Sequence, residues 1–320
     1  MNPFFETNQD ILNEYIGLKS NDHPQFYKFW KPHLRKSGFY SFLSGEESYL
    51  DFQNRLENLA DIPLGFSLAL ASMVEVNVVA SVLDKSIIPR AKEILEAIKH
   101  SDLVVGMGVS EPGFEGKLKN LSSKLENGKL TGIKSYITNG GEADIVLWVL
   151  PKGGFYPVYA VNLGTQQTNQ KKTLIETEFA KEVTHLKLEV LEFSINNEDL
   201  VLEDYGNLGI ILRLKELLSL VSLLLGKTKP LLEDSEKLTR VWNTLKDWKT
   251  NFLNDWGTSV VESELKNGFP YPIEDLLSAL AKHFGLNNIH DLSKIDPDYQ
   301  LFLWDDAFTK YLKMKKNKNL

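Results

Sequence analysis

Between Val104 and Pro151 this chain alternates short apolar runs with turn residues, and no other feature constrains the fold as much. Four runs have the length of β-strands, namely Val104–Val109, Lys117–Leu125, Leu130–Thr138 and Ile145–Leu150. The segments between them carry turn signals, which are Ser110-Glu111-Pro112-Gly113, Asn127-Gly128 and Asn139-Gly140-Gly141. A meander of this kind predicts an antiparallel sheet or a small barrel with one covered face.

The first 102 residues predict helices, because their apolar residues recur at a spacing of three and four. The expected helices are Gln9–Leu18, Pro24–Arg35, Tyr49–Leu59, Pro63–Leu83 and Ile88–His100. The fourth is almost wholly apolar, so we expect it to be buried on most of its sides. Residues 1–102 are therefore the expected N-terminal helical domain.

Residues 103–203 are expected to form a central β domain. The meander is followed by strand-like runs at Phe155–Leu163 and Val183–Phe193, a polar linker at Thr165–Lys172 and a short last strand at Leu200–Leu202. Residues 204–320 again predict helices, at Asn207–Gly226, Ser235–Asp255, Pro272–Phe284 and Asp296–Tyr311. We interpret Gly226 as the glycine that lies just beyond the end of a helix. The expected fold class is α+β multidomain: a helical N-terminal domain, a central antiparallel β-barrel-like domain and a C-terminal helical bundle.

Charge and composition exclude several classes of function. The formal net charge of −7 argues against a general nucleic-acid binder, and the absence of cysteine excludes disulfides, thiolate metal sites and a cysteine nucleophile. His283 and His290 lack a supporting pair of carboxylates, so we expect no metal site. The most apolar run, Leu208–Leu225, carries three charged residues and predicts a bundle helix rather than a membrane span. No secretory signal is visible, so a cytoplasmic protein is expected.

Two blocks of the meander carry a specific pattern. The first is Val109-Ser110-Glu111-Pro112-Gly113; the second is Gly132-Ile133-Lys134-Ser135-Tyr136-Ile137-Thr138-Asn139-Gly140, followed by Ala143-Asp144. They resemble the middle domain of the acyl-CoA dehydrogenases, where a strand ends in Thr-Glu-Pro and a later strand reads Gly-x-Lys-x-Trp-Ile-Thr-Asn-Gly. The order of helices, β domain and helices is also the order of that family.

The resemblance implies a site for FAD and an oxidoreductase that acts on an acyl-CoA or another acyl thioester, with an electron-transfer partner. Tyr136 and Thr138 are two residues apart, so on a strand they project from the same face. In the family this face carries the flavin ring, with an aromatic packed on it and a threonine hydroxyl on N5. Met107, Val109 and Ser110 would then contact the pyrimidine end. Taken singly, Tyr136 is better explained as an ordinary cross-strand aromatic and Thr138 as an ordinary strand residue, and only the two blocks together favour the flavin face.

Several departures from the family pattern concern the cofactor and the chemistry. The family has Gly-Ala-Gly-Ser-Asp after Glu-Pro, whereas this chain has Gly113-Phe114-Glu115-Gly116-Lys117. The family's Arg-Phe-Gly, Gln-x-x-Gly-Gly and Tyr-Glu-Gly segments are missing, and its Trp is replaced by Tyr136. We therefore expect FAD to be held weakly or to be lost. The alternative function is a non-catalytic relative that keeps the fold as a binding or scaffold protein.

The catalytic base stays unassigned. The nearest carboxylates in the expected region are Glu203, Asp204 and, further on, Glu216. Glu203 and Asp204 are better explained as a pair at a helix N-terminus, where the helix dipole favours negative charge. The family associates through its C-terminal helices, and a wide apolar stripe here contains Trp242, Leu245, Trp248 and Phe252. We expect at least a homodimer.

Overall fold

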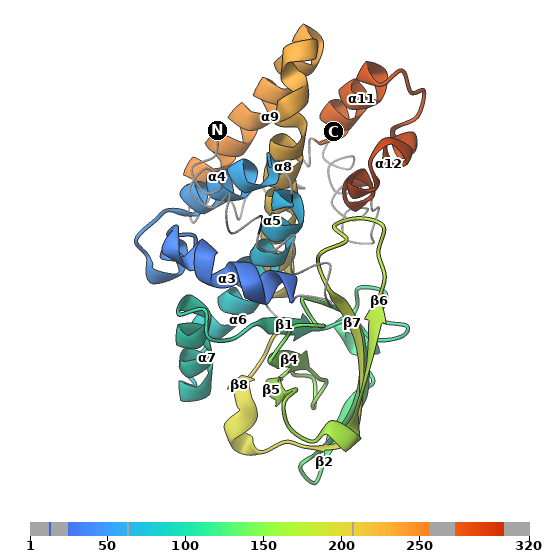
Figure 1. Ribbon diagram of the computed structural model, residues 1–320. Helices are drawn as coiled ribbons and strands as arrows, with labels where there is room; N and C mark the ends of the chain where they lie inside the picture. The colour runs from blue at the N-terminus through green and yellow to red at the C-terminus, as the bar shows by residue number, and fades with distance from the viewer. Residues whose placement is uncertain (1–12, 14–24, 63, 207, 256–272, 304–320) are drawn as a thin grey trace. The chain divides into compact units, whose positions relative to one another are not determined.

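The computed structural model describes residues 13, 25–62, 64–206, 208–255 and 273–303 (Figure 1). They fall into two compact units: unit 1 comprises residues 1–46, 67–177 and 181–216, and unit 2 comprises residues 47–66, 178–180 and 217–320. The expected helix Gln9–Leu18 lies outside the described residues apart from Asn13, as does the expected helix Asp296–Tyr311 beyond residue 303.

The helices of unit 1 follow the predicted ranges to within two residues. Helix α3 (Phe26–Lys36) buries an apolar stripe that also contains Lys31, and α7 (Pro89–Lys99) begins with proline, whose φ suits the first helical position. A continuous helix from Gly65 to Asp84, in unit 1 from Ser67 onward, comprises α5 (Gly65–Met73), a π-helical stretch (Val74–Ala80) and α6 (Ser81–Asp84). Within the described residues this helix alone is long and apolar enough to cross a membrane, and 94% of its most apolar window is buried in the protein.

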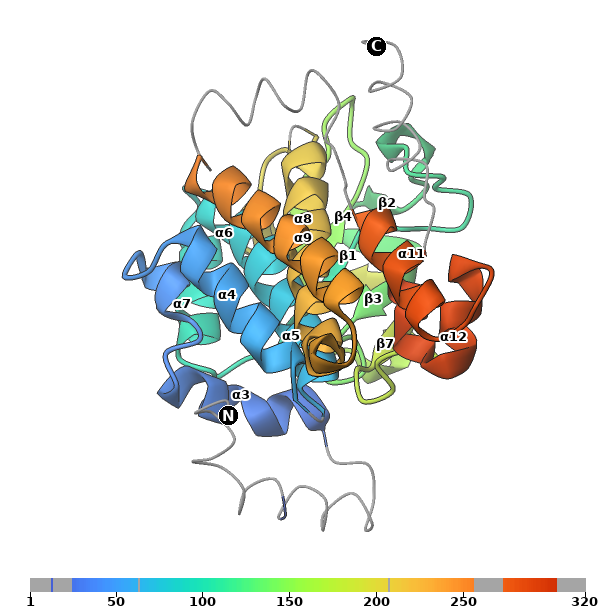
Figure 2. The ribbon, with the colours of Figure 1, turned by 90° about the horizontal axis from the view of Figure 1, so that it is seen from above.

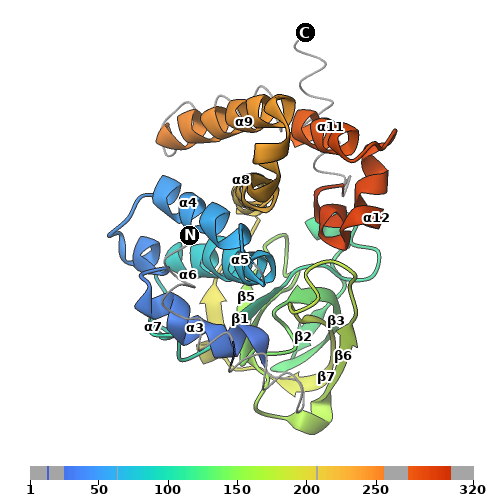
Figure 3. The same cartoon turned by 45° about the horizontal axis from the view of Figure 1, so that its top comes forward.

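The strands form two four-stranded sheets (Figure 1). The first has the order β1 (Val105–Gly108), β4 (Ile145–Val149), β5 (Val158–Asn162) and β8 (Leu200–Leu202). The second has the order β2 (Lys124–Glu126), β3 (Lys129–Thr138), β7 (His185–Ser194) and β6 (Gln170–Ile175), which lie side by side in Figure 3. Helices, two sheets and helices thus follow one another along the chain, which confirms the predicted α+β class.

Strand β4 explains why one run of the meander is apolar without interruption. Ile145, Leu147 and Val149 pack into a core with α6, α7 and the end of β1. Val146 and Trp148 point the other way, into a core between the two sheets. Both faces of the strand are covered, so an alternating pattern is not required.

Three expectations about the β domain were wrong in detail. Strand β1 pairs with β4 in parallel, so the domain is not wholly antiparallel. The expected strand Lys117–Leu125 is mostly a loop with one short 3₁₀ turn, and only its end joins β2. The expected linker Thr165–Lys172 enters β6, an edge strand paired only with β7. Its side chains are largely exposed, so it lacks the apolar alternation of a half-buried strand.

Unit 2 is helical. It contains α4 (Tyr49–Ala60), the part of α8 (Gly209–Thr228) from Leu217 onward, α9 (Glu236–Asn254), α11 (Ile273–His283), α12 (Leu292–Ile295) and a 3₁₀ helix (Pro297–Phe302). Helix α4 begins at a capping box in which Ser48 and Asp51 satisfy each other's backbone N–H groups. Helix α9 crosses α8 (Figure 2), and the indole Nε1 of Trp242 donates to the carbonyl oxygen of Leu225 over 2.8 Å.

Gly226 does not end a helix, contrary to expectation. It lies inside α8, and a Cβ atom at this position would come within 2.1 Å of the carbonyl oxygen of Glu57 in α4. The glycine is required because the two helix backbones approach closely. Glu57 also connects α4 to α9 through a buried ion pair, since its carboxylate accepts from the Nζ of Lys249 over 2.5 Å.

Candidate functional site

The two sequence blocks lie side by side in unit 1. The backbone N–H of Ser135 donates to the carbonyl oxygen of Ser110 over 2.8 Å, so the residues after β1 run next to β3. The five predicted site residues belong to this junction or its immediate neighbours, and we call them the β1–β3 face: Met107, Val109, Ser110, Tyr136 and Thr138. A proximity that the sequence resemblance only implied is thus present in the fold.

A buried ion pair connects the blocks. Glu111 and Lys134 are both fully buried, with 2.7 Å between Oε1 and Nζ. The Nζ also donates to the carbonyl oxygens of Val109 and Val149, and the carboxylate accepts from the backbone and hydroxyl groups of the segment Ser122–Ser123. Burial lowers the pKa of Lys134 to about 8. Every charge of the pair has partners, which is the condition for an ion pair to be tolerated in a protein interior.

Glycines let β1 approach β3 closely. A Cβ atom on Gly106 would lie 2.7 Å from Cγ2 of Ile137, and one on Gly108 would lie 2.9 Å from Cγ of Lys134. Gly106 and Gly108 therefore serve packing between the sheets.

Tyr136 and Thr138 are both half-buried, and each is next to His185 at the start of β7. The rings of Tyr136 and His185 are stacked with 4.6 Å between centroids and 27° between planes, and Thr138 is the register partner of His185. Burial lowers the pKa of His185 to about 4, so its imidazole is neutral near pH 7. Burial also raises the pKa of Tyr136, so its phenol is protonated. The aromatic of the second block is thus a neutral ring supported from one side.

His185 was missed as a candidate site residue. The sequence placed it only at the beginning of the closing strand, and its pairing with Thr138 depends on the register of β3 and β7. That register contains a β-bulge between Lys134 and Ile137, where β3 has one more residue than β7 between successive register partners. Such bulges are common beside functional sites, because they change the direction of a side chain.

The three predicted residues at the end of β1 differ in exposure. Met107 is 7% exposed and its side chain packs into the core with α6 and α7, so only its main chain is available to a ligand. Val109 and Ser110 are half-buried. The side chain of Ser110, unlike that of Met107, is therefore open to contact.

The end of β3 has the polar character that a flavin ring requires. The buried atoms Asn139 Oδ1 and Thr184 Oγ1 have no hydrogen-bond partner among the described residues. Buried oxygens in this state usually bind water or a ligand. Tyr136 and Thr138 nearby are half-buried, and an aromatic ring and a hydroxyl group on one face of a strand suit a flavin ring.

The candidate phosphate-binding residues fit less well. In unit 2, Lys227 already pairs with Asp296 and Asp298, each at 2.7 Å. In unit 1, Lys117 is exposed and lies 3.7 Å from Glu115 in the turn after Pro112. FAD carries a diphosphate that cations normally meet, and this chain lacks the arginine of the family's Arg-Phe-Gly segment. Lys117 and Lys227, the cations considered in its place, are both engaged with carboxylates, and Glu115 adds a negative charge.

Two of the three carboxylates considered for a catalytic base, Asp204 and Glu216, have structural partners. Asp204 accepts from the backbone N–H groups of Tyr156 and Gly206 at 3.0 and 2.9 Å. Glu216 pairs with Arg213 at 3.0 Å, and Glu203 is exposed. Across the described ranges, no group of three histidine or acidic side chains could hold a metal ion.

No family model matches this sequence, and no curated protein matches it. Solved structures do match it. The apo-form of PigA is 15% identical with a TM-score of 0.69, over 92% of this chain and 90% of that chain. A structure of the electron transferring flavoprotein of Acidaminococcus fermentans is 12% identical with a TM-score of 0.70, over 99% and 98%. Butyryl-CoA dehydrogenase from Megasphaera elsdenii is 16% identical with a TM-score of 0.58, over 71% and 68%.

The chain has the acyl-CoA dehydrogenase fold. The match to butyryl-CoA dehydrogenase and the adjacency of the two sequence blocks agree on this point. At such identities the comparison establishes the acyl-CoA dehydrogenase fold and leaves activity to experiment.

Proposed function

We propose that this chain is a flavin-dependent oxidoreductase of the acyl-CoA dehydrogenase fold that acts on an acyl thioester. The observation that carries the proposal is the hydrogen bond from Ser135 to Ser110, which brings both sequence blocks onto one surface. Proteins of the same fold support the choice of cofactor and substrate: PigA has been solved with FAD and proline, and AnaB is a prolyl acyl carrier protein oxidase. The acyl carrier can thus be CoA or another thioester-bearing carrier.

In this proposal the β1–β3 face holds the flavin ring of FAD, which supplies hydride acceptance when bound. Tyr136 would pack on the ring, and its stack on His185 keeps it in place. The hydroxyl of Thr138 would donate to N5 of the flavin. Ser110 and the main chain of Met107 and Val109 bind the pyrimidine end.

The same proposal includes weak binding of FAD. The diphosphate of FAD needs cations or helix N-termini to bind it. Lys227, however, is already paired with two aspartates, and Glu115 adds a negative charge that repels the diphosphate. A lost charge-assisted hydrogen bond costs about 1.5–3 kcal/mol. Loss of both the family's arginine and the serine of its Gly-Ala-Gly-Ser-Asp segment would weaken FAD binding by roughly two to four decades.

A second candidate function is a non-catalytic relative that keeps the fold as a binding or scaffold protein. It is favoured by the engagement of Asp204 and Glu216, which leaves no assigned base for removing an α proton. Acyl-CoA turnover with an artificial electron acceptor distinguishes the two. Turnover that is abolished by Thr138→Val supports the oxidoreductase, and a protein that binds FAD or acyl-CoA without turnover supports the second function.

The apolar stripe of α9 offers a surface for assembly. On α9, Trp242 and Leu245 are already buried, which leaves the stacked pair Trp248 and Phe252 as the partly exposed end of the stripe. We propose that this end of the stripe forms the contact between subunits of a homo-oligomer. We also propose that the protein has an electron-transfer partner and is located in the cytoplasm. Its functional domains are proposed to divide near residues 102 and 203. A dimeric or larger mass by light scattering at micromolar concentration supports the oligomer, and a monomeric mass contradicts it.

A further inference from the structure

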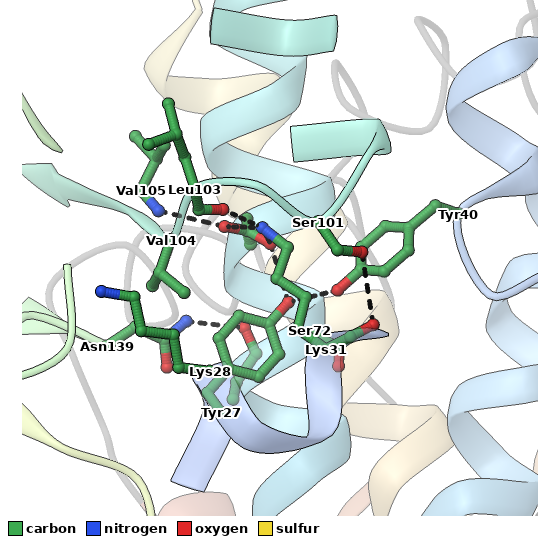
Figure 4. Close-up of polar contacts among 12 residues, drawn as sticks. Tyr27, Lys28, Lys31, Tyr40, Ser72, Ser101, Leu103, Val104, Val105 and Asn139 are labelled. Atoms are coloured by element: carbon green, nitrogen blue, oxygen red, sulfur yellow. Dashed lines mark hydrogen bonds and ion pairs between the residues drawn. The ribbon is translucent and has the colours of Figure 1, made fainter. Parts of the chain in front are cut away.

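A buried polar cluster in unit 1 lies where α3, the π-helical stretch and the start of β1 meet (Figure 4). Glu75 is 0% exposed and Lys31 1% exposed, with 2.7 Å between Oε2 and Nζ. The hydroxyl of Tyr27 donates to the same carboxylate over 2.8 Å, and the hydroxyl of Tyr40 lies 2.8 Å from that of Tyr27. Burial and the neighbouring Glu75 raise the pKa of Tyr27, which keeps the phenol protonated and able to donate.

The cluster also holds the backbone at the start of β1. The N–H of Val105 donates to Oε1 of Glu75 over 3.0 Å, and the Nζ of Lys31 donates to the carbonyl oxygen of Leu103. Strand β1 is an edge strand, paired only with β4. The edge is buried at Val105, so its outward N–H group needs a partner that a neighbouring strand does not supply.

A second carboxylate, that of Asp144, binds the backbone of Val104, the residue before Val105. The N–H of Val104 donates to Oδ2 of Asp144 over 2.9 Å, and Asp144 pairs with Lys28 of α3 at 2.6 Å. Two lysines of α3 are therefore connected through two carboxylates to two successive N–H groups of the chain that enters β1. Figure 4 shows Lys31, Val104 and Val105 within this one cluster.

The position of Glu75 within its helix is unusual. It belongs to the π-helical stretch Val74–Ala80, which interrupts an otherwise regular helix. Such stretches are rare and occur most often at functional sites. A charged residue in an apolar buried helix, aimed at the strand that leads to Ser110, has a role that packing alone does not explain.

We propose that Glu75 and Lys31 are positioning residues for the β1–β3 face. They hold the entry of β1, and through the four residues of that strand they set the Met107–Ser110 backbone opposite Tyr136 and Thr138. This inference rests on the proposed flavin function for its consequence, but the positioning itself is a property of the protein without FAD.

The test compares two double variants of the full chain. Lys31→Met/Glu75→Leu removes both charges of this pair, and Lys249→Met/Glu57→Leu removes a buried pair of unit 2 that does not touch β1. Apolar residues of similar size often replace a buried ion pair without loss of the fold. Amide hydrogen exchange of residues 105–110 is measured without FAD, followed by the FAD dissociation constant and the flavin absorbance spectrum.

We expect the Lys31/Glu75 variant to raise exchange at residues 105–110 and to weaken FAD binding, each by about tenfold relative to the Lys249/Glu57 variant. A shifted flavin spectrum should accompany the weaker binding. Equal exchange and equal affinity in the two variants overturn the inference. A wild-type protein that takes up no FAD overturns the proposed function instead, while exchange at residues 105–110 still decides the positioning.

If the Lys31/Glu75 variant does not fold, Tyr27→Phe provides the same test on a smaller scale. This substitution deletes one hydrogen bond to Glu75 and keeps the ion pair. Faster exchange of the Val105 amide supports the inference, and unchanged exchange contradicts it.

Discussion

Ser110 and Ser135 are 25 positions apart in the sequence, yet the backbone N–H of Ser135 donates to the carbonyl oxygen of Ser110 over 2.8 Å. This bond places the end of β1 beside the middle of β3. Glu111 and Lys134, the next residue on one side and the preceding residue on the other, form the buried ion pair that accompanies it. The end of β1 and the middle of β3 therefore form the β1–β3 face together, and a substitution in either segment should shift the position of the other.

Replacing Lys134 by methionine should destabilise unit 1. The substitution leaves Glu111 buried without its cation, and breaking such a pair costs about 3–5 kcal/mol of the free energy of unfolding. Urea denaturation measures the loss. Lys129→Met is the matched control, because Lys129 is on the same strand but exposed, and its effect should stay within about 0.5 kcal/mol. Equal effects of the two substitutions would contradict the structural role of the pair.

Gly226→Ala and Gly209→Ala should have opposite effects although both change α8. At residue 226 the new Cβ meets a backbone oxygen at 2.1 Å, so α4 must move and stability should fall by about 1–3 kcal/mol. At residue 209 the nearest atom is 3.7 Å away, and alanine should raise stability by up to about 1 kcal/mol. Thermal unfolding distinguishes them, and a neutral Gly226→Ala would show that the helices are not this close.

Glu142 should make the protein less stable as pH rises. Burial raises its pKa to about 7 from an ordinary 4.5, although its carboxylate accepts from the backbone N–H of Lys28 over 2.9 Å. A raised carboxyl pKa means that the folded protein binds the proton more tightly, so the stabilisation is present below the unfolded pKa and is lost toward pH 7. Relative to Glu142→Gln, the wild type should lose about 3 kcal/mol between about pH 4 and pH 8.

Unfolding of both proteins across this pH range measures the difference. Glu126→Gln, at an exposed position on β2, is the control and should show no such trend. A gap between wild type and Glu142→Gln that stays constant with pH would mean that Glu142 ionises normally.

Glu115→Lys should tighten FAD binding. The substitution exchanges a negative for a positive charge in the turn that follows Pro112, where the diphosphate is proposed to approach. We expect about a tenfold lower dissociation constant at low ionic strength and a smaller gain at high salt, because exposed charges are screened. Glu126→Lys makes the same charge change in the β2–β3 hairpin and should have little effect. Equal effects of the two would indicate a general charge effect and no local phosphate site.

The regular elements could be predicted from the sequence because their periodicity is local. Helices such as α4 and α9 and the apolar strand β4 follow directly from the spacing of their apolar residues. The parallel pairing of β1 and the role of Gly226 could not, because both depend on what lies opposite in space. Edge strand β6 was missed because few of its side chains are buried.

The site was predicted in part. The motif blocks gave its residues, but the stack on His185 and the ion pairs of Glu111 and Glu75 join distant positions. One signal was present for the pair of α3: Lys31 lies on the helical stripe of Tyr27, Trp30 and Leu34, so its burial could have been inferred. The partner of a buried lysine cannot be read from a periodicity.

Calorimetric titration of the apo-protein with FAD tests the central claim, that the β1–β3 face binds a flavin. We predict a micromolar dissociation constant for the wild type and binding at least about tenfold weaker for Tyr136→Ala. Phe155→Ala, at an exposed aromatic of the same unit, should leave the affinity unchanged. No binding by the wild type, or binding that Tyr136→Ala leaves unaltered, would contradict the account.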